Sequence, residues 1–125
     1  MTEALFDVVG IGNALVDVIA HVDEAFLKTH DLVKGAMTLI DAGRADDLYA
    51  QMPPAVEASG GSAGNTIAGV ASLGGRSAYI GKVCDDQLGR VYRHDIRAAG
   101  VTFDVVAAEA GSTGRCLIVV TPDAQ

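Results

Sequence analysis

The sequence predicts an α/β protein built on a parallel or mixed sheet. Short β-branched runs alternate with segments of helical spacing along its 125 residues, a length that suits one compact domain. Half of the residues are hydrophobic and only a fifth are charged, so the chain can bury enough apolar surface to fold. Because aromatic residues make up 5% and Trp is absent, small aliphatic residues must form the core, as in layers of sheet and helix.

The predicted elements follow one another with clear boundary signals. Strands are expected over residues 6–11, 14–22, 32–40, 77–83, 101–107 and 116–121, and helices over 24–28, 44–52, 63–73 and 87–99. Asp41 and Asp86 are placed to cap two of these helices, Pro53-Pro54 ends one, and Gly100 ends the last.

The net charge of −7, from 16 acidic and 9 basic residues, argues against nucleic acid as a partner. No cluster of Lys and Arg is present in the sequence. Arg90, Arg93 and Arg97 come closest, but acidic residues stand among them, and together they indicate a solvated helix face.

The cysteines and histidines predict neither a metal site nor a disulfide framework. Cys84 and Cys116 are isolated, and the three histidines are scattered, so metal-ligand spacing is missing. The N-terminus lacks the basic segment of a secretory signal, and Asn13 and Asp17 interrupt the apolar stretch 8–22, so no membrane span is expected. We expect a soluble protein of a reducing, cytoplasmic compartment with free thiols.

The first motif, Gly10-Ile11-Gly12, follows a predicted strand directly and has two interpretations. A dinucleotide-binding turn of a Rossmann oxidoreductase begins in this way, but it needs a third small residue where Leu15 stands and a helix next. The β-branched residues of 16–22 favour a strand instead. In a strand, Asn13, Leu15 and Asp17 point to one face because side chains alternate.

Asp17 is the candidate binding residue of this strand, with Asn13 beside it. A carboxylate among aliphatic neighbours is costly unless donors hydrogen-bond it. Vicinal sugar hydroxyls are suitable donors, each bond to a charged group contributing ~1.5–3 kcal/mol. The alternative is that Asp17 faces water at a strand edge, and the spacing alone does not decide between the two.

The second motif is Gly60-Gly61-Ser62-Ala63-Gly64-Asn65. Paired glycines let backbone approach a ligand closely, Ser62 is placed to cap the following helix, and Asn65 falls near its exposed N–H groups. Such a helix end suits hydroxyls or anions. The alternative is a tight strand-to-helix turn in which Asn65 only bonds locally.

Together these segments resemble the PfkB family of carbohydrate and nucleoside kinases, which includes ribokinase and adenosine kinase. Asn13-x-Leu15-x-Asp17 after Gly12 is most similar to the adenosine kinase branch. Gly60-Gly61-x-x-x-Asn65 and Leu73-Gly74 resemble the amino-terminal signature of the family, and Gly81-Lys82-Val83 with Asp86 and Gly89 resembles the segment after it. The resemblance implies a ribokinase-like three-layer sandwich with a small β lid over about 14–22, 32–40 and 115–121.

The resemblance also implies the residues of a substrate site. Asp17 would accept hydrogen bonds from sugar hydroxyls, and Asn13, Gly60, Gly61 and Asn65 would complete the sugar site. Three further residues fall where relatives of adenosine kinase line the base pocket: Leu15, Leu39 and Cys116. A core role suits the two leucines equally well.

By the same resemblance, the reaction is transfer of the ATP γ-phosphoryl group to a sugar or nucleoside hydroxyl, with Mg²⁺. The family's catalytic Asp, anion hole and ATP-binding half lie beyond the end of this chain, so no catalytic or metal-binding residue is predicted here. A turn signature at 121–123 also predicts a returning strand, and hence a longer protein. We expect these residues alone to be inactive, and a homodimer through the lid strands is a further expectation. A dinucleotide-binding module and a non-catalytic interaction fragment remain the alternatives.

Overall fold

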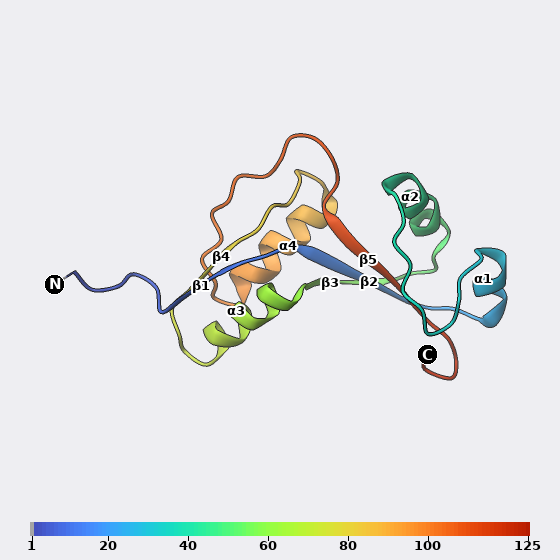
Figure 1. Ribbon diagram of the computed structural model, residues 1–125, viewed down its shortest axis with the longest axis horizontal. Helices are drawn as coiled ribbons and strands as arrows, with labels where there is room; N and C mark the ends of the chain where they lie inside the picture. The colour runs from blue at the N-terminus through green and yellow to red at the C-terminus, as the bar shows by residue number, and fades with distance from the viewer. Residues whose placement is uncertain (1) are drawn as a thin grey trace. The chain divides into compact units, whose positions relative to one another are not determined.

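The computed structural model describes residues 2–125 and divides them into two compact units (Figure 1). The first unit holds residues 2–17 and Glu57–Cys116, and the second holds Val18–Val56 and Leu117–Gln125. Three strands form a sheet in the order β3–β2–β5, and each of them contains residues of both units. The bounds of this sheet are β2 (Leu15–His21), β3 (Val56–Gly60) and β5 (Gly114–Val120).

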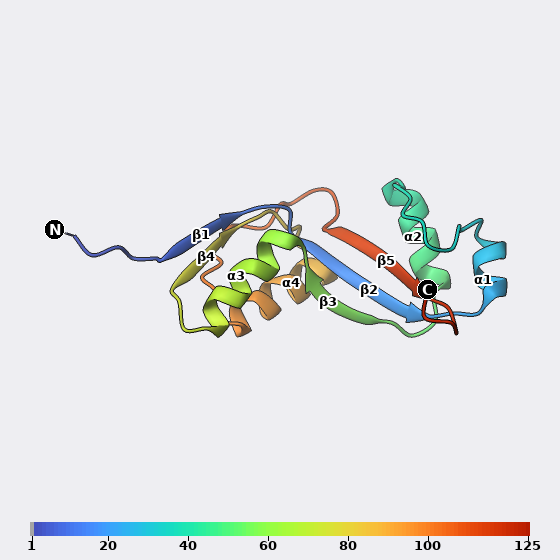
Figure 2. The ribbon, with the colours of Figure 1, turned by 60° about the horizontal axis from the view of Figure 1, so that its bottom comes forward.

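The first unit is built on the strands β1 (Val8–Ile11) and β4 (Ser77–Ile80), which pair in parallel. Thr102 continues this sheet, since its N–H donates to Ser77 O at 3.0 Å and its carbonyl accepts from Tyr79 N at 3.0 Å. The helices α3 (Ser62–Ser72) and α4 (Gln87–Ala98) lie on one side of these strands (Figure 2). The predicted α/β class is confirmed.

The prediction that small aliphatic residues form the core is only partly right, because three aromatic rings fill the centre of the first unit. The rings of Tyr79, Tyr92 and Phe103 are each no more than 1% exposed, and their centroids lie 5.7–6.1 Å apart. Gly10 lets α3 approach β1, because a Cβ at this position would lie only 2.4 Å from Ile67 Cγ1. Packing between β1 and α3 therefore requires a glycine at position 10.

The second unit contains the short helices α1 (Glu24–Thr29) and α2 (Ala42–Gln51). The Asp23 carboxylate accepts from Phe26 N at the start of α1, and the Asp41 carboxylate accepts from Arg44 N at the start of α2, as predicted for Asp41. Leu27 of α1 and Leu48 of α2 are buried.

Two of the predicted strands are wrong. Residues 32–40 form no strand: Gly35 has a φ of +73° in a turn, and Val33, Met37 and Leu39 are 71–90% exposed, so no neighbouring strand buries them. Residues 101–107 contribute only the isolated bridge at Thr102, because the chain then leaves the sheet. The third lid strand expected from the resemblance is thus absent from residues 32–40.

The strand β3 was not predicted, and the remaining helices and strands begin and end within a few residues of their predicted bounds. None of the helices in residues 2–125 has the length and apolar character needed to cross a membrane.

Candidate substrate-binding site

β2 carries the first group of candidate residues because its side chains alternate. Val16, Val18 and Ala20 are buried, whereas Leu15 and Asp17 are only half-buried on the opposite face. Asn13, just before the strand, is exposed. A strand follows Gly12 where the dinucleotide-binding turn needs a helix, so the structure contradicts the Rossmann alternative.

The Asp17 carboxylate lies directly against Gly60 at the end of β3. A Cβ on Gly60 would be 2.5 Å from Asp17 Oδ2 and 3.0 Å from Asp17 Cγ, so a larger residue here would force the carboxylate to shift. Glycine therefore leaves room for the carboxylate to lie directly against the end of β3. Asp17 is half-buried beside Gly60 and is not fully exposed.

Gly61 allows the turn between β3 and α3 to lie close to the segment just before β2. Its φ of +92° belongs to the left-handed region that favours glycine, and a Cβ here would lie 2.9 Å from Asn13 O and 4.0 Å from Leu15 Cβ. The structure thus gathers Asn13, Leu15 and Asp17 around the paired glycines.

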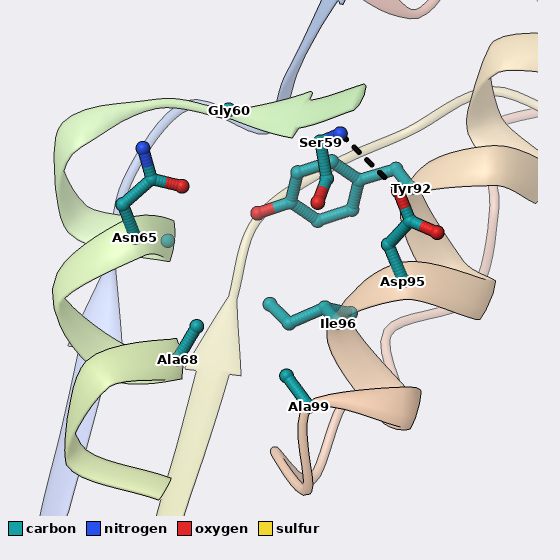
Figure 3. Close-up of a pocket in the computed structure, with 9 residues that line it drawn as sticks. Ser59, Gly60, Asn65, Ala68, Tyr92, Asp95, Ile96 and Ala99 are labelled. Atoms are coloured by element: carbon teal, nitrogen blue, oxygen red, sulfur yellow. Dashed lines mark hydrogen bonds between the residues drawn. The ribbon is translucent and has the colours of Figure 1, made fainter. Parts of the chain in front are cut away.

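The start of α3 differs from the prediction in its cap. Gly61 occupies the N-cap position with no side-chain hydrogen bond, and Ser62 is the first helical residue, so the predicted Ser62 cap is wrong. A φ of +92° at Gly61 turns the chain into the helix one residue earlier than a serine cap requires. Asn65 lies in the first part of α3, where its N–H donates to Gly61 O at 2.9 Å, and its side chain lines a small cavity together with Gly60 (Figure 3).

Cys116 on β5 completes the cluster. Burial and the nearby Asp17 carboxylate raise the pKa of the Cys116 thiol, although the residue is exposed overall. Gly114, at the start of β5, was not a predicted site residue: a Cβ there would lie 2.8 Å from Leu15 Cδ2. The sequence signal for it was a glycine at the edge of an apolar strand.

Leu39 is the predicted site residue that belongs to the second unit, where it lies in the irregular segment 32–40 with its side chain 90% exposed. This exposure contradicts the core role, and the base-pocket role stays a prediction.

Asp86, predicted as a helix cap, has a second function in the structure. Its carboxylate accepts from Gly89 N at 2.7 Å in α4 and from both Thr113 N and Thr113 Oγ1, at 2.8 and 2.6 Å. It therefore fixes the residues that lead into β5, and with them the position of Cys116.

No metal centre forms among the residues the structure describes: in 2–125, no three His, Cys, Asp or Glu side chains come close enough to hold an ion. The chemistry available at the cluster is instead that of hydrogen bonding. The Asp17 carboxylate, the backbone carbonyl of Asn13 and the start of α3, which has no side-chain cap, lie beside the paired glycines.

Comparison with known proteins agrees with this arrangement. The sequence matches the pfkB family of carbohydrate kinases over residues 7–125, and the chain belongs to this family. Adenosine kinase 1 from Arabidopsis thaliana is 30% identical over 128 residues, covering 96% of this chain and 37% of that protein. Fructokinase-1 from Oryza sativa is 40% identical over 63 residues, covering 50% of this chain and 20% of that protein.

Solved structures show the same fold. The crystal structure of adenosine kinase from Sinorhizobium meliloti is 60% identical with a TM-score of 0.81, and covers 96% of this chain and 37% of that chain. A probable sugar kinase from Rhizobium etli is 52% identical with a TM-score of 0.81, and covers 97% and 37%. The predicted ribokinase-like fold and family are confirmed, and the chain spans about a third of the length of these relatives.

Proposed function

We propose that the cluster around Asp17 and the paired glycines binds the hydroxyl groups of a sugar or nucleoside. In this proposal the chain supplies the substrate-binding part of a kinase that transfers a phosphoryl group from ATP. The observation that carries it is the position of the Asp17 carboxylate against Gly60, an acceptor beside a residue that has no side chain.

The chemistry of the cluster suits vicinal hydroxyls. Asp17 accepts two O–H donors through its carboxylate, and the carboxamides of Asn13 and Asn65 can donate or accept. A ribose ring that lies against Gly61 would meet backbone rather than a Cβ. Each hydrogen bond to the charged group contributes ~1.5–3 kcal/mol, so Asp17 dominates recognition.

A nucleoside is the proposed substrate class within this family. Leu15 and Cys116 give the cluster an apolar side next to the carboxylate, which suits a purine ring attached to the ribose. The similarity to adenosine kinases over nearly the whole chain supports the same choice. Strands β2 and β5 are proposed as parts of a lid that excludes water during transfer.

ATP and Mg²⁺ are proposed to bind outside these residues. ATP supplies the phosphoryl group, and the metal neutralises its developing charge. Residues 2–125 bring together no group of carboxylates that fits the metal, so we derive no step through it here. The part of this chain is to bind, orient and shield the acceptor hydroxyl.

Three further expectations belong to the proposal. The two cysteines are free, which supports a reducing, cytoplasmic setting. The acidic balance supports a small molecule, not nucleic acid, as the partner. Pairing of lid strands between two copies remains a proposed route to a homodimer.

Calorimetric titration with adenosine, ribose and fructose tests the binding claim. We expect adenosine to bind the chain and Asp17→Asn to weaken it at least tenfold, because one charged acceptor is lost. The matched control Glu109→Gln removes an exposed carboxylate elsewhere and should leave affinity unchanged. Equal affinity in wild type and Asp17→Asn would reject the proposed site.

A coupled assay for ADP release tests the claim that these residues bind the substrate but do not transfer the phosphoryl group. We expect the 125-residue chain to give no turnover above blank with ATP, Mg²⁺ and any of the three substrates. Turnover by the purified chain that disappears in Asp17→Asn would show that these residues contain the transfer machinery, contrary to the proposal.

A further inference from the structure

A small cavity lies between α3 and α4, beside the Gly60–Gly61 turn (Figure 3). Its volume is about 40 Å³, room for one water molecule. Its polar wall is formed by Ser59, Asn65, Tyr92 and Asp95, and small aliphatic side chains of the two helices line the remainder. A polar cavity of this size is the kind that holds ordered water.

The Tyr92 hydroxyl is the group in this wall that lacks a partner. Tyr92 is 1% exposed, and its hydroxyl makes no hydrogen bond within the described residues. The oxygen lies against α3, since a Cβ on Gly64 would be 2.6 Å from it. Burial raises the pKa of Tyr92, and the neighbouring Tyr79 side chain raises it further, so the hydroxyl keeps its proton and can donate. Buried hydroxyls in folded proteins are almost always satisfied, by protein or by water.

The other polar groups fix the shape of the wall. The Asp95 carboxylate accepts from Ser59 N at 3.2 Å, which ties α4 to β3, and its other oxygen lies 3.3 Å from His94 Nδ1. Figure 3 shows the Asn65 side chain and the Tyr92 hydroxyl directed into the same space from α3 and α4. A water molecule there would find the two to four polar partners that it needs.

We propose that one ordered water molecule binds in this cavity, and that Tyr92 acts through it as a positioning residue for Asn65. The Tyr92 hydroxyl donates to the water, and the water in turn bonds the Asn65 carboxamide. The helix α4 thereby fixes the orientation of a side chain that the proposed function places at the substrate.

The effect on the ligand rests on the proposed function, whereas the water site does not. A carboxamide held by water in one orientation loses less freedom on binding than a mobile one. Loss of the Tyr92 hydroxyl should therefore weaken the binding of adenosine about three- to tenfold, the change in affinity expected for one neutral hydrogen bond.

The second buried hydroxyl provides a matched control. Tyr79 Oη also lacks a partner within the described residues, but Tyr79 does not line this cavity. Its ring centroid lies 6.1 Å from that of Tyr92 and its side chain raises the pKa of Tyr92, so a direct bond between the two hydroxyls is the rival explanation. That rival predicts that Tyr79→Phe and Tyr92→Phe have the same effects.

Nuclear magnetic resonance of the isotope-labelled 125-residue chain tests the proposal. We expect a water-to-protein Overhauser signal at the methyl protons of Ala68, which line the cavity and are not attached to an exchangeable group. The signal should disappear in Tyr92→Phe and in Gly64→Ala, whose methyl group displaces the hydroxyl, and persist in Tyr79→Phe. The Asn65 side-chain amide resonances should shift in the first two variants only.

The possible results separate the water site, the positioning role of Tyr92 and the proposed function. Absence of the water signal in the wild type overturns the site, and this measurement does not depend on any variant folding. A water signal with unmoved Asn65 resonances in both Tyr92→Phe and Gly64→Ala overturns the positioning role. If adenosine binds neither wild type nor variants while the water signal is present, the proposed function fails and the water site stands.

Discussion

At the scale of single residues, the candidate site depends on glycines that leave room for their neighbours. Gly60 gives space to the Asp17 carboxylate, and Gly61 lies against the carbonyl of Asn13 with a φ of +92°. The requirement at Gly61 is therefore double, since both the backbone conformation and the close approach exclude a side chain.

Gly61→Ala is expected to lower the free energy of unfolding and to abolish adenosine binding. The left-handed conformation alone costs an alanine ~1–2 kcal/mol, and the new Cβ would also meet Asn13 O at 2.9 Å. Gly74→Ala is the matched control, because Gly74 has a φ of +90° and a Cβ there would have nothing within 4 Å. Urea unfolding and calorimetry should show the backbone cost in both variants, and loss of binding in Gly61→Ala only; equal behaviour would contradict the role of the close approach.

The residues beside the paired glycines follow from local patterns in the sequence. Alternation along β2 places Leu15 and Asp17 on one face, and Asn13 comes just before the strand. The strand expected around Leu39 is absent, because a strand needs a partner elsewhere in the chain that a local pattern does not reveal. Gly114 was missed because only a contact across β5 and β2 shows why a glycine stands there.

At the scale of elements, the joint between α4 and β5 depends on Asp86. Burial opposes its ionisation, but hydrogen bonds from Thr113 and Gly89 outweigh that cost and hold the pKa of Asp86 below its usual value. The contribution of Asp86 to stability is thus present above its ordinary pKa of 3.8 and is lost as the pH falls through the lower pKa of the folded state.

Asp86→Asn should cost about 1–3 kcal/mol of unfolding free energy at pH 7, because the neutral amide cannot accept from all the donors of Thr113 and Gly89. Asp41→Asn, which changes a cap that accepts from Arg44 N alone, should be nearly neutral. Denaturant unfolding between pH 7 and pH 2 should show wild type and Asp86→Asn converging as the pH falls. A constant difference between them across that range would contradict this assignment.

Elements with local signals were predictable, and elements without them were not. Asp41 and Asp86 marked two helix starts that the structure confirms, since a cap is a bond between near neighbours. Residues 32–40 have the composition of a strand, but a strand also needs a neighbouring edge, and the structure offers them a turn at Gly35 instead.

At the scale of the whole molecule, the chain exposes apolar side chains on β1 and β4. Val8, Val9, Ile11 and Ile80 are 41–76% exposed, and β1 pairs only with β4 among residues 2–125. An apolar strand with a free edge is a template for pairing with another chain. Self-association of the 125-residue chain is therefore expected through β1.

Val9→Lys should weaken this self-association, because a charge on an edge strand disfavours pairing. Leu73→Lys adds the same charge at a 90% exposed position after α3 and serves as the control. Sedimentation velocity over a range of concentrations measures the change. If Val9→Lys associates as strongly as the control, pairing through the proposed lid strands becomes the better explanation.

The central claim is that Asp17, held beside the paired glycines, receives the hydroxyls of a sugar or nucleoside. A crystal structure of the chain grown with adenosine tests it most directly. The account predicts ribose hydroxyls within hydrogen-bond distance of the Asp17 carboxylate, with the ring against Gly61. Adenosine bound elsewhere on the chain, with Asp17 contacting no hydroxyl, would contradict it.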